Sequence, residues 1–434
     1  MKIIRILTAI LLAVILSVNF VPKAWAFCGF YVAKADSKLY NQASQVILAR
    51  DGNRTILTMA NDFQGDVKDF AIIVPVPVVI QQEQVNVGDP KIIERLDAFS
   101  APRLVEYFDP DPCETYRGGE AVNRQGGATR GLDDERERQS ALGVQVEARF
   151  TVGEYDILIL SAKESDALET WLRQNGYRIP RGASELLRPY IRQNMKFFVA
   201  KVNLEEFDKT GSQFLRPLQM AYESSKFMLP IRLGMMNAST DQDLIVYVLS
   251  PKGQAEITNY RTVNVPSDAE IPLFVKNEFN DFYKAMFQTA YIREGKNVAF
   301  REYTWDMNSC DPCSAEPLNG EELKKAGVFW LTPNSLNNVF ITRLHVRYSR
   351  QKFPEDLTFQ ETSNRQQFQG RYILRHPFTG EMNCEAGKTY QQSLSARFEQ
   401  ETKTLSRLTA WKVEDIRKKI NLAQNQPWWR TIWP

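Results

Sequence analysis

The sequence predicts an α+β fold, in which an antiparallel, strand-rich body precedes a helical C-terminal segment. Short runs of β-branched and other apolar residues, separated by turn-forming residues, recur through the first part of the chain. Towards the C-terminus, apolar residues recur instead at the spacing of a helix face. Strands that come early and helices that come late favour α+β over a doubly wound parallel sheet.

A β-hairpin is predicted near the N-terminus. Residues 45–49 and 55–59 are strand-like runs, and Asp51-Gly52 lies between them. Because Asp-Gly supplies the backbone freedom of a tight turn, the two runs are expected to pair as neighbours.

A proline-containing strand and a capped helix follow. Residues 70–78 form a β-rich run, but Pro75 and Pro77 cannot donate ladder hydrogen bonds, so the run suits an edge strand or a strand end. Asp89 and Pro90 then begin a helix, with Asp89 as the N-cap and Pro90 at the first helical position.

Residues 117–143 differ in character from the rest of the chain. They are rich in glycine and contain a run of charged side chains at 133–138, so they offer almost nothing to bury. We predict a loop or linker here; a binding arm is the less favoured interpretation. After it, residues 144–160 alternate like paired strands broken at Gly153, and residues 165–175 have the pattern of a helix.

The C-terminal segment is predicted to be helical. Tyr390, Leu394 and Phe398 fall on one helix face, and Leu405 and Leu408 continue the apolar pattern. The chain as a whole divides into six segments. They are a secretory signal peptide (1–26), an N-terminal strand-rich unit (27–116), a flexible charged and Gly-rich loop (117–143), a second α+β unit (144–300), a strand-rich unit containing Cys-x-x-Cys (301–388) and a helical segment with a Trp-rich tail (389–434).

The first 28 residues indicate where the protein works. A short basic region precedes the apolar run 6–18, and residues 24–26 have the small-x-small pattern that signal peptidase cuts. This run is too short to span a bilayer, and Phe27 is too bulky for lipoprotein cleavage before Cys28. We therefore expect export across the cytoplasmic membrane, to a periplasmic or extracellular compartment.

Composition limits the chemistry that this chain is expected to perform. The formal net charge is +2, which gives no reason to expect nucleic acid as a partner. His345 and His376 are the two histidines, so acid–base chemistry and most metal sites are disfavoured, and no metal or cofactor is expected. His345 lies in an alternating run, shares a face with Arg343 and is expected on a strand surface. His376 is expected in a turn.

Five cysteines follow the predicted cleavage site, and in an exported protein they are expected to form disulfides. Because five is odd, at most two bridges form, and the sequence leaves their pairing open. The candidates are Cys28, Cys113, Cys310, Cys313 and Cys384.

Cys310 and Cys313 form a Cys-x-x-Cys motif with three possible roles: a structural disulfide, which we favour, metal ligation, or redox exchange. A thioredoxin-type exchanger needs a helix directly after the motif, and Pro317 and Gly320 disfavour one here. Zinc held by these two thiols with those of Cys113 and Cys384 is a weaker possibility, since the spacing lacks a second Cys-x-x-Cys motif.

The C-terminal tail is rich in tryptophan. Trp428, Trp429 and Trp433 lie close to Arg430, and aromatic side chains with arginine suit a membrane interface or a groove on a protein partner. The simpler interpretation is a tail folded back onto the protein.

Several unusual stretches of the chain together carry a resemblance. They are residues 28–36, 44–46, 50–52, 59–65, 74–77, 101–107, 233–238, 310–313, 353–357 and 371–377. In combination they resemble one family, the bacterial exported proteins catalogued as domain of unknown function 2330. The resemblance spans nearly the whole mature chain and implies an exported bacterial protein. The family has no assigned activity, so the resemblance assigns no catalytic residue.

These observations favour a non-catalytic, disulfide-supported binding or scaffold protein outside the cytoplasmic membrane. The alternative is a thiol–disulfide enzyme that uses Cys310 and Cys313. A third hypothesis is peripheral membrane attachment through Trp428, Trp429 and Trp433.

Overall fold

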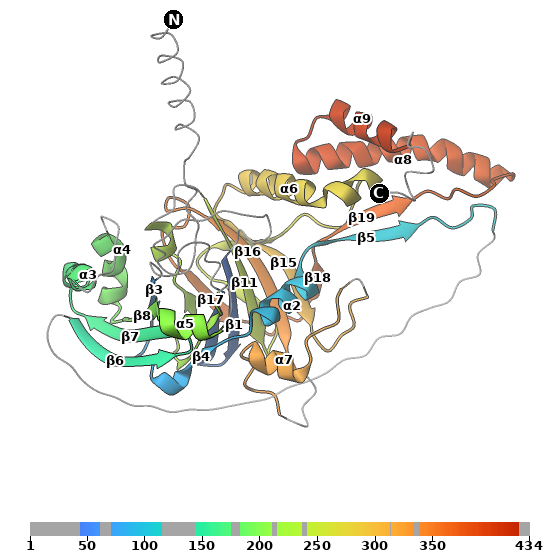
Figure 1. Cartoon of the computed structure of the whole chain (residues 1–434). Coiled ribbons are helices and arrows are strands. Elements are labelled where there is room, and N and C mark those ends of the chain that lie inside the picture. The colour runs from blue at the N-terminus through green and yellow to red at the C-terminus, as the bar shows by residue number, and fades with distance from the viewer. Residues whose placement is uncertain are drawn as a thin grey trace, which may run out of the picture.

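The computed structural model describes residues 44–60, 71–114, 144–174, 183–210, 215–236, 241–312, 314–332 and 338–424. Their centre is a mixed sheet of nine strands in the order β13-β15-β16-β11-β1-β2-β9-β4, with β18 paired to β15 (Figure 1). The strands are β1 (Ser44–Asp51), β2 (Arg54–Met59), β4 (Val85–Val87), β9 (Leu218–Glu223), β11 (Gln242–Ser250), β13 (Arg261–Asn264), β15 (Val298–Asp306), β16 (Phe340–Tyr348) and β18 (Phe368–Gln369).

A second, fully antiparallel sheet packs against one face of this main sheet. Its order is β3-β8-β7-β6, and the helices α3 and α4 cover its outer face. Helix α5 follows β8. The elements are β3 (Ala71–Val76), β6 (Val144–Val152), β7 (Tyr155–Ala162), α3 (Ser165–Gln174), α4 (Ala183–Arg192), β8 (Lys196–Val202) and α5 (Leu204–Thr210).

Two small sheets complete the strand content of the described residues. The first, in the order β10-β17-β12, is antiparallel; the second, in the order β14-β19-β5, is parallel and extends away from the main sheet beside α8 (Figure 1). Their strands are β5 (Arg103–Phe108), β10 (Met228–Leu229), β12 (Ala255–Ile257), β14 (Ala269–Glu270), β17 (Leu357–Glu361) and β19 (Arg371–His376).

Helices cover the other face of the main sheet. They are α2 (Pro90–Ser100), α6 (Phe279–Arg293), α7 (Gly320–Lys325), α8 (Glu385–Thr409) and α9 (Val413–Gln424), with short 3-10 turns η2 (Gln82–Gln84), η3 (Leu233–Met236) and η4 (Leu273–Glu278). The turn between α8 and α9 begins at Ala410, whose backbone is left-handed. No helix among the described residues is long and apolar enough to span a membrane.

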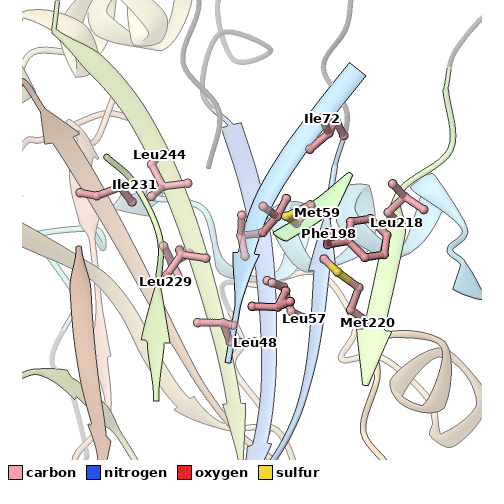
Figure 2. Close-up of a cluster of buried hydrophobic side chains, with 14 of the residues drawn as sticks. Leu48, Leu57, Met59, Ile72, Phe198, Leu218, Met220, Leu229, Ile231 and Leu244 are labelled. Atoms are coloured by element: carbon pink, nitrogen blue, oxygen red, sulfur yellow. The ribbon is translucent and has the colours of Figure 1, made fainter. Parts of the chain in front are cut away.

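The largest apolar core lies between the two larger sheets (Figure 2). Leu48 and Leu57 of the main sheet meet Ile72 and Phe198 of the second sheet there, and all four side chains are buried. Two further cores lie on the helix-covered face: one under α2 and α7, the other under α6, α8 and α9. Because the central strands are covered on both faces, the four consecutive apolar residues in the middle of β1, Val46 to Ala49, are all buried.

Local sequence signals predicted several elements correctly. β1 and β2 form the expected hairpin around Gly52, which has a φ of 59°. The side chain of Asp89 accepts a hydrogen bond from the backbone N–H of Lys91 at the start of α2. β3, with Pro75, lies at the edge of its sheet.

The predicted fold class, α+β with an antiparallel strand-rich body and a helical C-terminal segment, is confirmed. The six predicted segments remain a prediction, and strands of the main sheet come from residues 27–116, 144–300 and 301–388. The signal peptide and the loop 117–143 lie outside the described residues.

Candidate functional site

A row of ionisable side chains crosses the helix-covered face of the main sheet. Arg343, His345 and Arg347 alternate along β16, so their side chains share one face. On β11, Tyr247 lies opposite Arg343 and Asp243 lies opposite Arg347. One member of the row, Tyr247, also belongs to the apolar core under α2 and α7. The row is called the ion network below.

A β-bulge brings Glu302 into this network. On β15, Phe300 pairs with His345 and Tyr303 pairs with Arg343, and the register shifts between Arg301 and Tyr303. Glu302 is therefore an extra residue without a partner opposite it. Bulges redirect side chains in this way, and here the carboxylate reaches both Arg343 and His345.

The side chain of Glu302 is only 1% exposed, and both oxygens of its carboxylate have hydrogen-bond partners within the protein. Its Oε2 accepts a hydrogen bond from Nε of Arg343 at 2.6 Å, and its Oε1 lies 2.8 Å from Nδ1 of His345. The hydroxyl of Tyr283 donates to the same Oε1. Burial raises the pKa of Glu302, but the charges of Arg343 and His345 outweigh burial and lower the pKa to about 2.

His345 lies between two carboxylates. Its Nε2 is 3.0 Å from Oδ1 of Asp243, and its ring stacks on Phe287 at a centroid distance of 3.8 Å. Burial lowers the pKa of His345, but Glu302 and Asp243 outweigh burial and raise the pKa above its ordinary value. The protonated imidazolium is thus favoured.

The expectation that His345 is a strand-surface residue is wrong. His345 is 7% exposed, because α6 covers this part of β16 and places Phe287 over the ring. Arg343 is 1% exposed, more deeply buried still.

Asp243 joins His345 to Arg347. Nε of Arg347 donates to Oδ1 of Asp243 and Nη2 donates to Oδ2, both at 2.8 Å, in a bidentate pair. Nη1 of Arg347 donates to the side chain of Gln288 at 2.7 Å. Burial raises the pKa of Asp243, but His345 and Arg347 hold it well below its ordinary value.

Asp97 of α2 closes the opposite end of the network. Its Oδ1 accepts hydrogen bonds from Nη1 of Arg343 at 2.7 Å and from the hydroxyl of Tyr247 at 2.9 Å. That hydroxyl also accepts from Nε2 of Gln45 on β1 at 3.2 Å. Side chains from α2, α6 and four strands therefore form one continuous chain of contacts.

A pocket of about 310 Å³ opens over the network. Helix α6 contributes two rows of side chains to its wall: Tyr283 and Phe287 are buried, whereas the neighbouring row of Asn280, Lys284 and Gln288 is exposed. This outer row follows the i, i+4, i+8 spacing of one helix face. The remaining lining residues are Gln45, Asp97, Pro102, Asp243, Ile245, Glu302, Arg343, His345 and Arg347.

The carboxylates and basic side chains that line this pocket are paired with one another. The carboxylates of Asp243 and Glu302 are each held by charged donors, and both ring nitrogens of His345 face carboxylates. Among the described residues, no group of three or more His, Cys, Asp or Glu side chains is arranged to hold a metal ion.

The described cysteines, Cys113, Cys310 and Cys384, do not line this pocket. Cys113, after β5, is bonded to Cys384, the N-cap of α8, across 271 residues of sequence. The disulfide ties the parallel three-stranded sheet to the C-terminal helices. It also excludes Cys113 and Cys384 from the four-thiolate zinc site that the sequence left open.

Cys310 is an exposed free thiol. It follows β15, and the next described helix is α7, which begins only at Gly320. Cys28 and Cys313 lie outside the described residues, so the role of the Cys-x-x-Cys motif stays a prediction. Trp428, Trp429 and Trp433 also lie outside them.

His376 ends β19 rather than occupying a turn. Its Nε2 is 2.8 Å from Oε2 of Glu106, and its ring stacks on Phe108 of the neighbouring strand.

Residues 22–360 match the family described as "Uncharacterized protein conserved in bacteria (DUF2330)". The chain belongs to this family. The match includes every residue of the DUF2330 ion network and pocket, whereas α8, α9 and Cys384 lie beyond it. No curated protein and no solved structure matches the chain.

The ion network was not predicted from the sequence. One signal was present: Arg343, His345 and Arg347 alternate within a strand that is otherwise apolar and aromatic. Three alternating cationic residues in such a strand require buried counter-charges. The sequence could not supply the partners, because Asp97, Asp243 and Glu302 come from distant segments.

Proposed function

We propose that this chain is an exported, non-catalytic binding protein that is stabilised by its disulfide. The protein binds a small-molecule ligand in the pocket between α6 and β16. One observation carries the proposal: Asn280 and Lys284, in the outer row of α6, stand at the rim of the pocket without a hydrogen-bond partner among the described residues, above a floor formed by the ion network. Lys284 makes no ion pair with any described residue. A preformed concave site with a few unengaged polar groups is typical of ligand-binding sites.

The ion network supports binding because it holds the floor of the pocket rigid before a ligand binds. Arg343 and Glu302 are both nearly inaccessible to solvent and are joined by a 2.6 Å hydrogen bond. Rigid walls lower the entropic cost of binding. The same pairing argues against catalysis, because a proton carrier or nucleophile needs a group that is free to change partners.

Export is proposed from the sequence of the first 26 residues, and the Cys113–Cys384 disulfide is compatible with an oxidising compartment. The bond joins the segment after strand β5 to the N-terminus of α8, so it ties the C-terminal helices to the parallel three-stranded sheet.

A ligand screen tests the proposal directly. The purified mature chain is mixed with a size-fractionated small-molecule extract of bacterial culture, and Tm and native mass are recorded. We expect a ligand adduct and a raised Tm for the parent protein. Asn280→Trp, which places a bulky side chain at the pocket rim, should abolish both effects.

Asp281→Trp is the matched control, because Asp281 is the next residue of α6, is also exposed and does not line the pocket. It should respond like the parent protein. The proposal is contradicted if no fraction binds, or if Asn280→Trp responds as fully as Asp281→Trp.

Thiol–disulfide exchange through Cys310 and Cys313 is the second candidate function, and the exposed free thiol of Cys310 favours it. The absence of a described helix directly after the motif weighs against it, because a helix N-terminus normally activates the first thiol. An insulin-reduction assay decides: activity in the parent protein that is lost in Cys310→Ala supports exchange, and an inactive parent protein refutes it.

A further inference from the structure

The carboxylates that line the pocket have their charge balanced by basic side chains of the protein. Asp243 faces Arg347 and His345, Glu302 faces Arg343 and His345, and Asp97 faces Arg343. These ion pairs leave little of the negative charge to attract a cationic ligand.

At the rim of the pocket, by contrast, several hydrogen-bond donors have no partner among the described residues. The ammonium of Lys284 and the side-chain amide of Asn280 make no hydrogen bond to a described residue, and neither does Nε2 of Gln288, whose Oε1 is engaged by Arg347. These three groups are exposed and lie along one face of α6. A donor-rich rim is complementary to a ligand rich in acceptors.

The charge balance of the lining points the same way. The ring nitrogens of His345 lie 2.8 Å and 3.0 Å from oxygens of Glu302 and Asp243, and both contacts are hydrogen bonds when both nitrogens carry a proton, so the ring counts as a cation. The charged lining then comprises four cations and three anions: Lys284, Arg343, His345 and Arg347 against Asp97, Asp243 and Glu302. The unbalanced charge is that of Lys284.

The pocket also has an apolar part. Pro102, Ile245 and Phe287 contribute to its lining beside the charged groups. Its volume of about 310 Å³ lies at the lower end of the range for small-molecule sites, which is roughly 300–1,000 Å³. A small molecule with one acidic group and a short apolar body fits these dimensions.

We infer that the ligand is a small organic anion, whose acidic group binds Lys284 beside Arg347 and whose body packs against Ile245 and Phe287. This inference rests on the proposed function and adds the chemical class of the ligand. It goes beyond membership of the DUF2330 family, which assigns no ligand.

Three probes of one shape and different charge test this class: 4-fluorobenzoate, 4-fluorobenzamide and 4-fluorobenzylamine, titrated with the mature chain and followed by fluorine NMR. We expect saturable binding of the benzoate and markedly weaker binding of the neutral and cationic probes. Lys284→Gln should weaken benzoate binding about tenfold or more, since a charge-assisted hydrogen bond is lost. Lys201→Gln, which removes an exposed lysine of β8 outside the pocket, should leave it unchanged.

The outcomes separate this inference from the proposed function. Preference for the amide or the ammonium probe, abolished by Asn280→Trp, overturns the anionic class but leaves the pocket as a binding site. Equal benzoate affinity in Lys284→Gln and Lys201→Gln also overturns the inference. Failure of all three probes overturns it too, and the proposed function then falls only if the extract screen is negative as well.

Discussion

Nδ1 of His345 lies 2.8 Å from Oε1 of Glu302, although 43 residues separate the two in sequence. Glu302 reaches this position because β15 bulges, and His345 is held there because Phe287 covers its ring. The pair links Arg343 on one side to Asp243 on the other. The stability of the pocket wall should therefore depend on this contact.

Removing the charge of Glu302 should destabilise the protein strongly. Glu302→Gln leaves Arg343 and His345 buried without their shared counter-charge, and breaking a buried ion pair on one side costs about 3–5 kcal/mol. Urea unfolding at pH 7 measures the loss. Glu94→Gln, at an exposed position on α2, is the control and should stay within about 0.5 kcal/mol of the parent protein; an equal effect of both substitutions would refute the account.

Stability should fall as pH rises through the folded pKa of His345. Its pKa is raised in the folded state, so the folded protein binds the proton more tightly than the unfolded chain. The contribution is complete below the ordinary pKa of histidine, about 6.5, and is lost at higher pH. Free energies of unfolding between pH 5 and pH 9 should show this slope for the parent protein and a shallower one for His345→Gln. An unchanged slope would contradict the inferred imidazolium.

Glu401 of α8 should impose a second alkaline loss of stability. Burial raises its pKa to about 7, and Arg397, 3.6 Å away, only partly opposes this effect. Its contribution is complete below pH 4.5 and is lost as pH rises through 7. Glu401→Gln should therefore match the parent protein at pH 5 and exceed its stability by on the order of 2 kcal/mol at pH 8.5. A Glu401→Gln protein that is less stable at pH 8.5 would refute this reading.

Loss of the disulfide should loosen the C-terminal helices. Replacing both Cys113 and Cys384 by Ser removes the covalent tie between β5 and α8, with an expected cost of about 2–4 kcal/mol. Hydrogen exchange should accelerate in α8 and α9 before it does so in β1 and β11. Cys310→Ser is the control and should leave both the stability and the exchange pattern unchanged, because Cys310 is free and exposed.

Local elements could be predicted from the sequence because their signals are local. Gly52 defines the hairpin, Asp89 and Pro90 define the start of α2, and Pro75 places β3 at a sheet edge. Each depends on backbone geometry within a few residues.

The candidate site could not be predicted in the same way, because its contacts are distant in sequence. Arg343 meets Asp97 across 246 residues, and the bulge that directs Glu302 exists only once β15 is paired with β16. His345 was predicted to lie on a strand surface because alternation within one strand does not reveal which helix will cover it. The pairing of Cys113 with Cys384 was open for a related reason: five cysteines allow many pairings, and only the fold selects one.

The location of a bound anion tests the central claim most directly. Crystals of the mature chain soaked in 4-bromobenzoate would reveal the bromine by its anomalous scattering. The account predicts a bromine site between α6 and β16, with the carboxylate of the probe within hydrogen-bonding distance of Lys284. Bromine bound elsewhere, with this pocket empty, would contradict the assignment of the pocket as the ligand site.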